Sequence, residues 1–225
     1  MSARAPIPEN FLPRFEALLT TLPLRDRLLI RMGMDTGFRI RELLDMTIGH
    51  VANLQFLPNR DVVLERRNLK FGRGVKARKV RARRVPLSPS VQDLVGQYLF
   101  ERFGSGPAEL EIMAQPLFPS RKGHAALTPR QALNIVQGAC QKAGLDPEIP
   151  VGTHSLRKTF ARRIYASTGY DINLTRASLG HANIETTQRY LAATEDEAYS
   201  AISRAVAPSR AIESRPLEPA GHASA

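Results

Sequence analysis

The 225-residue chain contains one cysteine, no tryptophan and no long run of apolar residues. Because Cys140 is the only thiol, the chain can form neither an intramolecular disulfide nor a four-ligand zinc site built on thiolates. The first residues, MSARAPIPENF, lack the apolar core of a secretion signal, and the short apolar runs offer no membrane span. These absences predict a cytoplasmic protein with a reduced thiol and no membrane association.

Acidic residues are few relative to basic ones. The chain has 21 Asp and Glu against 32 Lys and Arg, which gives a formal net charge of +11 and a pI near 10.5. Such an excess indicates a polyanionic partner, either nucleic acid or an anionic membrane surface. Because the sequence has no membrane span and no tryptophan anchors, the balance favours nucleic acid.

Most of this charge lies in one segment. Between Arg60 and Arg84, eleven basic residues against two acidic ones give a charge of +9. Alternation with valine and leucine predicts two strands, near 62–69 and 79–86, joined by a turn at FGRGVK. A basic hairpin suits a phosphate backbone, but a charge run is more often only a solvated surface. The residues that we expect to contact phosphates are Arg73, Lys76, Arg78, Lys79 and Arg81.

Outside the hairpin, apolar residues recur mostly at helical spacing. Ser88 with Pro89, and Thr128 with Pro129, are N-cap and first-turn pairs that mark two helix starts. The segment 104–119 is predicted as a loop with a brief strand at PLF, residues 116–118. Helices are predicted at 9–22, 24–36, 39–47 and 129–143, at segments beginning near 89 and 153, and at 172–179, 183–191 and 195–206. The expected fold class is therefore mainly α-helical with a small antiparallel β-sheet.

The expected organisation is one domain followed by a tail. Residues 1–206 carry the periodic apolar pattern of a globular domain, without a visible internal repeat. Residues 207–225 are dominated by Pro, Ser and Ala, a composition that predicts disorder.

Three short motifs place polar residues at helix starts and corners. TGFRIRELLDM places Arg39 just after a glycine corner. THSLRKTF places His154 and Arg157 three residues apart, on one helical face. LGHANIETTQRYL places His181 after a glycine and Tyr190 nine residues later. Each motif is weak alone, because an H-x-x-R pair is more often a surface pair, Tyr190 could pack in a core and His181 could cap a helix.

In this order, the motifs resemble those of the tyrosine recombinase (phage integrase) family, over about residues 10–200. The family carries an arginine in T-G-x-R-x-x-E-L, a hairpin lysine, H-x-x-R, a histidine or tryptophan after L-G, and a nucleophilic tyrosine. Apart from the lysine, the residues that match this set are Arg39, His154, Arg157, His181 and Tyr190. The resemblance implies that these residues are catalytic.

The lysine is harder to place than the other members of the set. RRNLKFGRG resembles the family's arginine-rich strand that ends in a lysine before the turn, which favours Lys70 as the general acid. Lys76 and Lys79 also qualify. Each of the three could instead only contact phosphate.

Phosphodiester cleavage through a tyrosine needs residues of these types. A phenol has a pKa of about 10, so it is a weak nucleophile unless nearby cations favour its ionised form. Guanidinium groups from Arg39 and Arg157 suit the charge that develops on phosphate oxygens, and a lysine can protonate the leaving 5′ oxygen. His154 could assist proton removal, and His181 could hydrogen-bond the phosphate. The 3′-phosphotyrosine keeps the bond energy, so neither a metal nor another cofactor is expected.

The resemblance implies a site-specific recombinase or integrase that acts on double-stranded DNA. It further implies a homotetramer on two DNA sites and a nucleoid-associated protein encoded by a prokaryote or by a mobile element. Two alternatives remain open. One is a topoisomerase IB-like nicking–closing enzyme, and the other is a DNA-binding regulator that does not cleave. The family often has a helical core-binding domain before the catalytic one. Only 38 residues precede Arg39, so no separate N-terminal domain of this kind is expected. In this respect the chain resembles the family's short, single-domain members or a truncated form.

Overall fold

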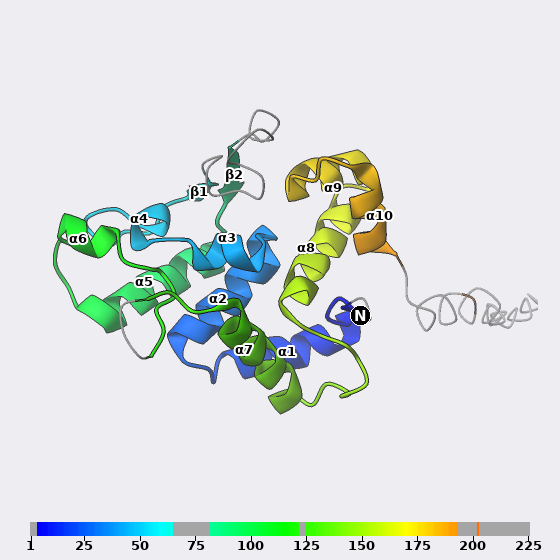
Figure 1. The fold of residues 1–225 in the computed structure, drawn as a ribbon, viewed down its shortest axis with the longest axis horizontal. Coiled ribbons are helices and arrows are strands. Elements are labelled where there is room, and N and C mark those ends of the chain that lie inside the picture. The colour runs from blue at the N-terminus through cyan, green and yellow to red at the C-terminus, as the bar shows by residue number, and fades with distance from the viewer. Residues whose placement is uncertain (1–3, 65–81, 122–124, 193–201, 203–225) are drawn as a thin grey trace, which may run out of the picture. The chain divides into compact units, whose positions relative to one another are not determined.

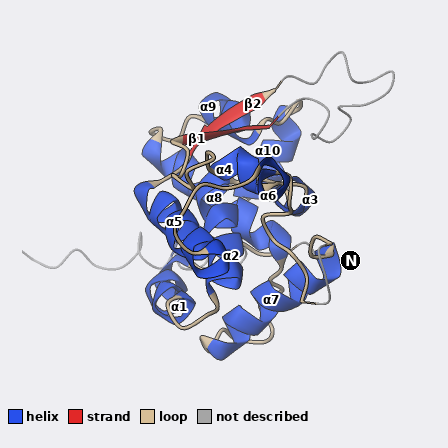
Figure 2. Ribbon diagram, turned by 90° about the vertical axis from the view of Figure 1, so that its left-hand side faces the viewer, coloured by secondary structure: helices blue, strands red, loops and turns tan. Residues whose placement is uncertain are grey.

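Helices dominate the computed structural model, and the sheet has two strands (Figures 1 and 2). The structure describes residues 4–64, 82–121, 125–192 and 202. The elements in these ranges are η1 (Glu9–Phe11), α1 (Leu12–Leu19), α2 (Leu24–Thr36), α3 (Ile40–Leu44), α4 (Ile48–Val51), β1 (Asp61–Leu64), β2 (Arg83–Pro86), α5 (Pro89–Phe103), α6 (Leu110–Met113), α7 (Pro129–Lys142), α8 (Thr153–Ser167), α9 (Ile172–Leu179) and α10 (Ile184–Leu191). The predicted fold class is confirmed.

Local capping signals explain where the longer helices begin and end. The Ser88 hydroxyl accepts a hydrogen bond from the Val91 amide at the start of α5, at 3.3 Å. The Thr128 hydroxyl accepts one from the Gln131 amide at the start of α7, at 3.2 Å. Both bonds satisfy amides that have no partner within the helix, as the cap-and-proline pairs predict.

The connection between α5 and α7 differs from the prediction. Segment 116–118 does not form a strand, and only isolated bridges join Thr47 to Pro116 and Pro119 to Ala126. Prolines at both ends of the segment remove amide donors that a strand ladder would use. Instead, the Leu117 amide donates to the Met46 carbonyl at 2.9 Å. The sequence does not predict the four-residue helices α4 and α6, because so short a helix shows no apolar period.

Helix α2 organises the core, because it packs against both α5 and α8. Leu28 and Leu29 belong to an apolar cluster with α5 and the sheet, whereas Ile30 and Met34 belong to a second cluster with α1 and α7. The approach to α8 is close at Gly33, where an added Cβ would lie 2.7 Å from Leu156 Cδ1. The lone cysteine, Cys140, is buried in the second cluster.

A third, smaller cluster joins α8, α9 and α10, which lie together in Figure 1. Phe160, Ala161 and Leu179 are buried there, and Tyr190 packs against them. Phe160 also contacts the end of α2, since a Cβ added at Gly37 would collide with Phe160 Cδ1. The C-terminal ends of α2 and α9 are thereby held close to α8.

Strands β1 and β2 pair antiparallel, with Val62 opposite Val85 and Leu64 opposite Arg83. Val62, Leu64 and Val85 are buried, so one face of this hairpin packs on the core. The rest of the predicted hairpin, residues 65–81, lies outside the described residues. So do Lys70, Arg73, Lys76, Arg78, Lys79 and Arg81, and so do the tail 207–225 and, apart from residue 202, the helix predicted at 195–206. No helix in the described ranges is long and apolar enough to cross a membrane.

Candidate active site

Two glycine corners bring the ends of α2 and α9 into one region. Gly37 follows α2 with a φ of 60°, and Gly180 follows α9 with a φ of 63°. Glycine adopts this left-handed conformation without the strain that a Cβ would cause. Each corner reverses the chain just before a polar residue, Arg39 after the first and His181 after the second.

Arg157 connects the two corners from the second turn of α8. Its side chain is buried, with 1% of the residue exposed. Nη1 donates to the carbonyl oxygen of Gly37, and Nη2 donates to that of Leu179 at 2.6 Å. Its Nε is also buried and forms no hydrogen bond with any residue in the described ranges. The guanidinium therefore retains N–H groups that these protein contacts do not use.

Arg83, on β2, makes a parallel set of contacts. Its Nη1 donates to the Leu179 carbonyl at 2.8 Å and its Nη2 to the Thr36 carbonyl at 3.3 Å. The guanidinium carbon lies 4.6 Å from the centroid of the Phe38 ring. The sequence motifs do not single out Arg83, which enters there only as part of the basic segment. Strand alternation could have identified it, because Arg83 and the buried Val85 share a face while Arg84 points outward.

Glu42 orients Arg39 at the start of α3. The Glu42 carboxylate accepts from Arg39 Nη1 at 2.6 Å and from the Arg39 amide at 2.7 Å. Glu42 is almost fully buried, whereas the Arg39 side chain is 29% exposed. One end of the Arg39 guanidinium is thus fixed inside the protein, and the side chain remains accessible to a ligand.

His181 and Tyr190 lie next to each other beside Arg157. Their ring centroids are 5.0 Å apart, with the rings edge to face at 71°. The Arg157 guanidinium carbon and Lys158 Nζ each lie 6.0 Å from the Tyr190 ring centroid. His181 Nδ1 and the Thr187 hydroxyl are 3.0 Å apart, which ties the Gly180 corner to the helix that carries Tyr190. The phenol is partly exposed among cationic groups.

Burial and like charges depress the pKa values in this region. Burial, followed by the charges of Arg157, Arg39 and Arg83, lowers the pKa of His181 to about 3. Burial, followed by the charges of Arg39 and Arg83, lowers the pKa of Arg157 to about 10. At neutral pH the imidazole is therefore neutral while Arg157 remains charged. The site is a concentrated positive field suited to an anion such as phosphate.

The structure brings together four of the five predicted site residues that it describes. Arg39, Arg157, His181 and Tyr190 are linked by the contacts and charge interactions above. His154 is exposed in the first turn of α8, three residues before Arg157, so the two side chains project from the same helical face. Lys70 lies outside the described residues.

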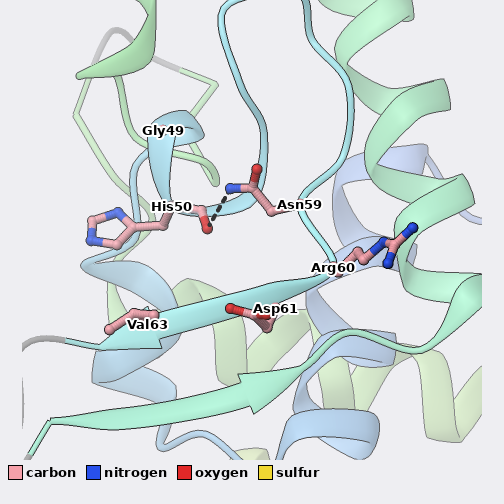
Figure 3. A pocket seen from close by; sticks show the side chains of 6 residues that line it. All are labelled: Gly49, His50, Asn59, Arg60, Asp61 and Val63. Atoms are coloured by element: carbon pink, nitrogen blue, oxygen red, sulfur yellow. Dashed lines mark hydrogen bonds between the residues drawn. The ribbon is translucent and has the colours of Figure 1, made fainter.

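A separate pocket of about 400 Å³ lies between α4 and β1 and contains none of these residues (Figure 3). Its lining residues are Gly49, His50, Asn59, Arg60, Asp61 and Val63. The Asn59 amide nitrogen donates to the His50 carbonyl at 3.3 Å, and Asp61 pairs with Arg84 at 2.6 Å. Of its ionisable side chains, Asp61 is already paired with Arg84, whereas the region at α8 brings several arginines, a histidine and a tyrosine together, so that region is the better candidate for chemistry.

The described fold is that of known recombinases. The crystal structure of XerA recombinase superposes with a TM-score of 0.65 at 20% identity, over 93% of this chain and 66% of that chain. XerH site-specific recombinase bound to its difH substrate, in a pre-cleavage complex, superposes with a TM-score of 0.62 at 25% identity, over 90% of this chain and 55% of that one. These likenesses confirm the expected tyrosine recombinase fold.

Sequence comparison leads to the same family. Tyrosine recombinase XerD of Corynebacterium glutamicum is 29% identical over 179 residues, which cover 80% of this chain and 52% of that protein. The chain thus spans about half the length of this curated relative. The sequence model of the Phage integrase family matches residues 9–197, a range that includes both glycine corners, Arg157 and Tyr190. The chain belongs to the phage integrase family.

Proposed function

We propose that this chain is a site-specific DNA recombinase that cuts and rejoins DNA through a 3′-phosphotyrosyl intermediate. The observation that carries the proposal is the position of Tyr190, a partly exposed phenol beside His181 and the buried Arg157. A nucleophile, a neutral hydrogen-bonding imidazole and converging guanidinium groups are what phosphoryl transfer to a tyrosine requires. The charge of +11 favours DNA as the partner, and XerH offers a DNA-bound relative of the same fold.

In the first step, Tyr190 Oη attacks the phosphorus, and the bond between phosphorus and the 5′ oxygen breaks. Arg39 and Arg157 stabilise the non-bridging oxygens through guanidinium N–H groups that their protein contacts leave available. His181, neutral at physiological pH, donates a hydrogen bond to the same phosphate. One phosphodiester replaces another, so a 5′ hydroxyl can reverse the step without metal or ATP.

Two proton transfers accompany the attack. The phenol proton leaves toward His154, which lies one helical turn before Arg157. The leaving 5′ oxygen takes its proton from a lysine of the basic hairpin, for which Lys70 is our first choice and Lys76 and Lys79 are the alternatives. In this proposal the general base belongs to α8 and the general acid to the basic hairpin.

The same proposal extends to DNA binding and assembly. Arg73, Lys76, Arg78, Lys79 and Arg81 would contact the phosphate backbone next to the reaction site. Residues 1–206 would form the catalytic domain, and recombination would proceed in a homotetramer on two DNA sites. Such a protein would act in the cytoplasm, on the nucleoid of a prokaryote or its mobile element.

A covalent-capture experiment tests the proposal. The protein is incubated with sheared DNA from the genome that encodes it, denatured in SDS, and DNA that remains attached to protein is recovered and sequenced. We expect the wild-type protein to enrich discrete sites and Tyr190→Phe to enrich none while retaining DNA affinity. Tyr165→Phe is the matched control, because Tyr165 packs on Tyr170 in an edge-to-face contact.

The alternatives predict different outcomes of the same experiment. A non-cleaving regulator would bind DNA without forming any adduct. A nicking–closing enzyme would form adducts and relax supercoiled plasmids but would not exchange strands between two copies of the enriched site. Adducts that persist in Tyr190→Phe would assign the nucleophile to another residue.

A further inference from the structure

We propose that Arg83 is a positioning residue which, together with Arg157, fixes the two glycine corners of the active site relative to each other. We call these two guanidinium groups, with the carbonyls of Thr36, Gly37 and Leu179, the arginine clasp. The inference rests on the proposed function. According to this inference, Arg83 at the base of the hairpin helps to align the catalytic residues, and this role does not depend on any contact between Arg83 and DNA.

The clasp joins groups that the helices leave without partners. Thr36 is the last residue of α2 and Leu179 the last of α9, so their carbonyls lack donors within the helix. Both guanidinium groups donate to the Leu179 carbonyl. Arg83 also donates to the Thr36 carbonyl, and Arg157 also donates to the carbonyl of the adjacent Gly37. A cation at a helix C-terminus also interacts favourably with the helix dipole. The clasp therefore ties both helix ends to β2 and α8.

Each carbonyl in the clasp lies directly beside a corner that carries a site residue. Leu179 precedes Gly180 and His181, and Gly37 is two residues before Arg39. A Cβ added at Gly180 would lie 3.4 Å from Arg83 Cδ, so this corner packs directly on the stem of Arg83. A shift of the Arg83 guanidinium would therefore change the distance between Arg39 and His181.

The chemistry of this position calls for arginine. A planar fork can donate to two carbonyls while its face covers the Phe38 ring, whereas a lysine ammonium is a point charge without a fixed fork or a flat face to lay on the ring. Arg83 Nε is buried and forms no hydrogen bond with the described part of the chain, as is true of Arg157. Burial lowers the pKa of Arg83 to about 10, so the group stays charged at neutral pH. Two buried cations at one carbonyl are unfavourable alone, and a bound phosphate would offset their repulsion.

The test compares Arg83→Gln and Arg83→Lys with Arg84→Gln. Arg84 is the next residue on the same strand, has a side chain that is 74% exposed, and pairs with Asp61 outside the site. Adduct formation is measured at saturating DNA, on duplexes of an enriched site with either a normal phosphate or a bridging 5′-phosphorothiolate at the cleaved step. The sulfur leaving group needs no protonation, so it rescues the loss of a general acid but not a misaligned phosphate.

We expect Arg83→Gln to slow adduct formation roughly 100-fold at saturating DNA, on both substrates, because small displacements of a reacting group have effects of this size. Arg83→Lys should remain at least about tenfold slower than wild type, since it keeps the charge but not the fork. Arg84→Gln should stay within about threefold of wild type. Rates for Arg83→Gln equal to those for Arg84→Gln, or full recovery by lysine or by the phosphorothiolate, would overturn the assignment.

A DNA-free measurement separates this inference from the proposed function. In NMR spectra, Arg83→Gln should shift the amide resonances of Gly37 and Gly180 and raise the pKa of His181, whereas Arg84→Gln should do neither. Unchanged corner resonances in a folded Arg83→Gln or Arg83→Lys protein would refute the clasp. If the wild-type protein forms no adduct while these shifts occur, the recombinase function fails and the clasp stands as a structural device.

Discussion

The rings of His181 and Tyr190 meet edge to face with their centroids 5.0 Å apart, and both residues belong to the same protein chain as Arg157. The candidate nucleophile is therefore already located at the arginines of its own protomer. An arrangement in which each protomer donates its tyrosine to a neighbour would require α10 to leave this position. For the proposed reaction, this position of Tyr190 favours cleavage in cis.

Cleavage in cis predicts that two defective proteins cannot complement each other. Arg39→Lys retains a positive charge that can pair with the buried Glu42 but loses the two-pronged guanidinium that would bind the phosphate. Tyr190→Phe lacks the proposed nucleophile. Mixed in equal amounts on DNA that carries two sites, they should form no more adduct than the sum of the two tested alone. Restored adduct on the Arg39→Lys subunit would show that its tyrosine attacks at a neighbour's site.

The depressed pKa of His181 predicts a dependence of stability on pH. The folded-state pKa is about 3 and the ordinary value is 6.5, so between these limits the unfolded chain binds a proton that the folded chain does not. The free energy of unfolding should fall as the pH is lowered from about 6.5 toward 3, with a contribution of at most about 1.4 kcal/mol per pH unit. Above pH 6.5 this contribution is constant.

Urea titrations of the wild type and His181→Gln at several pH values measure this contribution. The variant should show a smaller change in unfolding free energy between pH 7 and pH 5, since glutamine does not titrate. Equal pH profiles for the two proteins would mean that His181 is accessible to protons in the folded state.

Alanine substitutions at the two glycine corners should destabilise the protein to different extents. Gly180→Ala introduces a left-handed alanine, which costs about 1–2 kcal/mol, while its Cβ meets Arg83 only at 3.4 Å. Gly37→Ala adds a collision with Phe160 Cδ1 to the same backbone strain, so it should destabilise the protein more. Gly138→Ala, inside α7 with no neighbour within 4 Å of the added Cβ, should instead stabilise by about 0.5–1 kcal/mol. Urea unfolding checks the order of the three.

DNA affinity should depend strongly on salt through the basic segment. Each phosphate that the protein ceases to neutralise should reduce the slope of log K against log salt by about 0.9. Lys76→Gln with Arg78→Gln should therefore flatten the slope on any DNA sequence. Arg130→Gln with Lys142→Gln removes the same charge from α7, which lies away from the sheet in both views, and should leave the slope nearly unchanged (Figures 1 and 2). Equal effects of the two pairs would indicate general attraction rather than contact by the segment.

The sequence predicts those features whose causes are local. Ser88 and Thr128 cap helices that begin where their hydroxyls predict, because a cap depends only on residues within one turn. The left-handed Gly37 ends α2 for the same reason. The strand predicted at 116–118 fails because the effect of its flanking prolines outweighs that of its apolar residues.

The clasp could not be predicted in this way. Arg83 is one of eleven basic residues in its segment, and although strand alternation can assign it to the inward face, the local sequence does not identify the Leu179 carbonyl as its partner. Its role arises from a tertiary contact between a strand, a helix end and α8. The order of motifs can indicate Arg39, Arg157, His181 and Tyr190 through family resemblance, but the residues that hold them in place follow only from the fold.

Helix α10 buries little of its surface against the rest of the described structure. Thr187 is its one fully buried residue, and that residue is polar. Beneath the helix lies the small cluster of Phe160, Ala161 and Leu179, which is separate from the two larger clusters built on α2. The helix that carries the candidate nucleophile could thus move away by breaking the Thr187–His181 contact, and the main core would stay intact. Such a movement would separate Tyr190 from Arg157 without unfolding the main core.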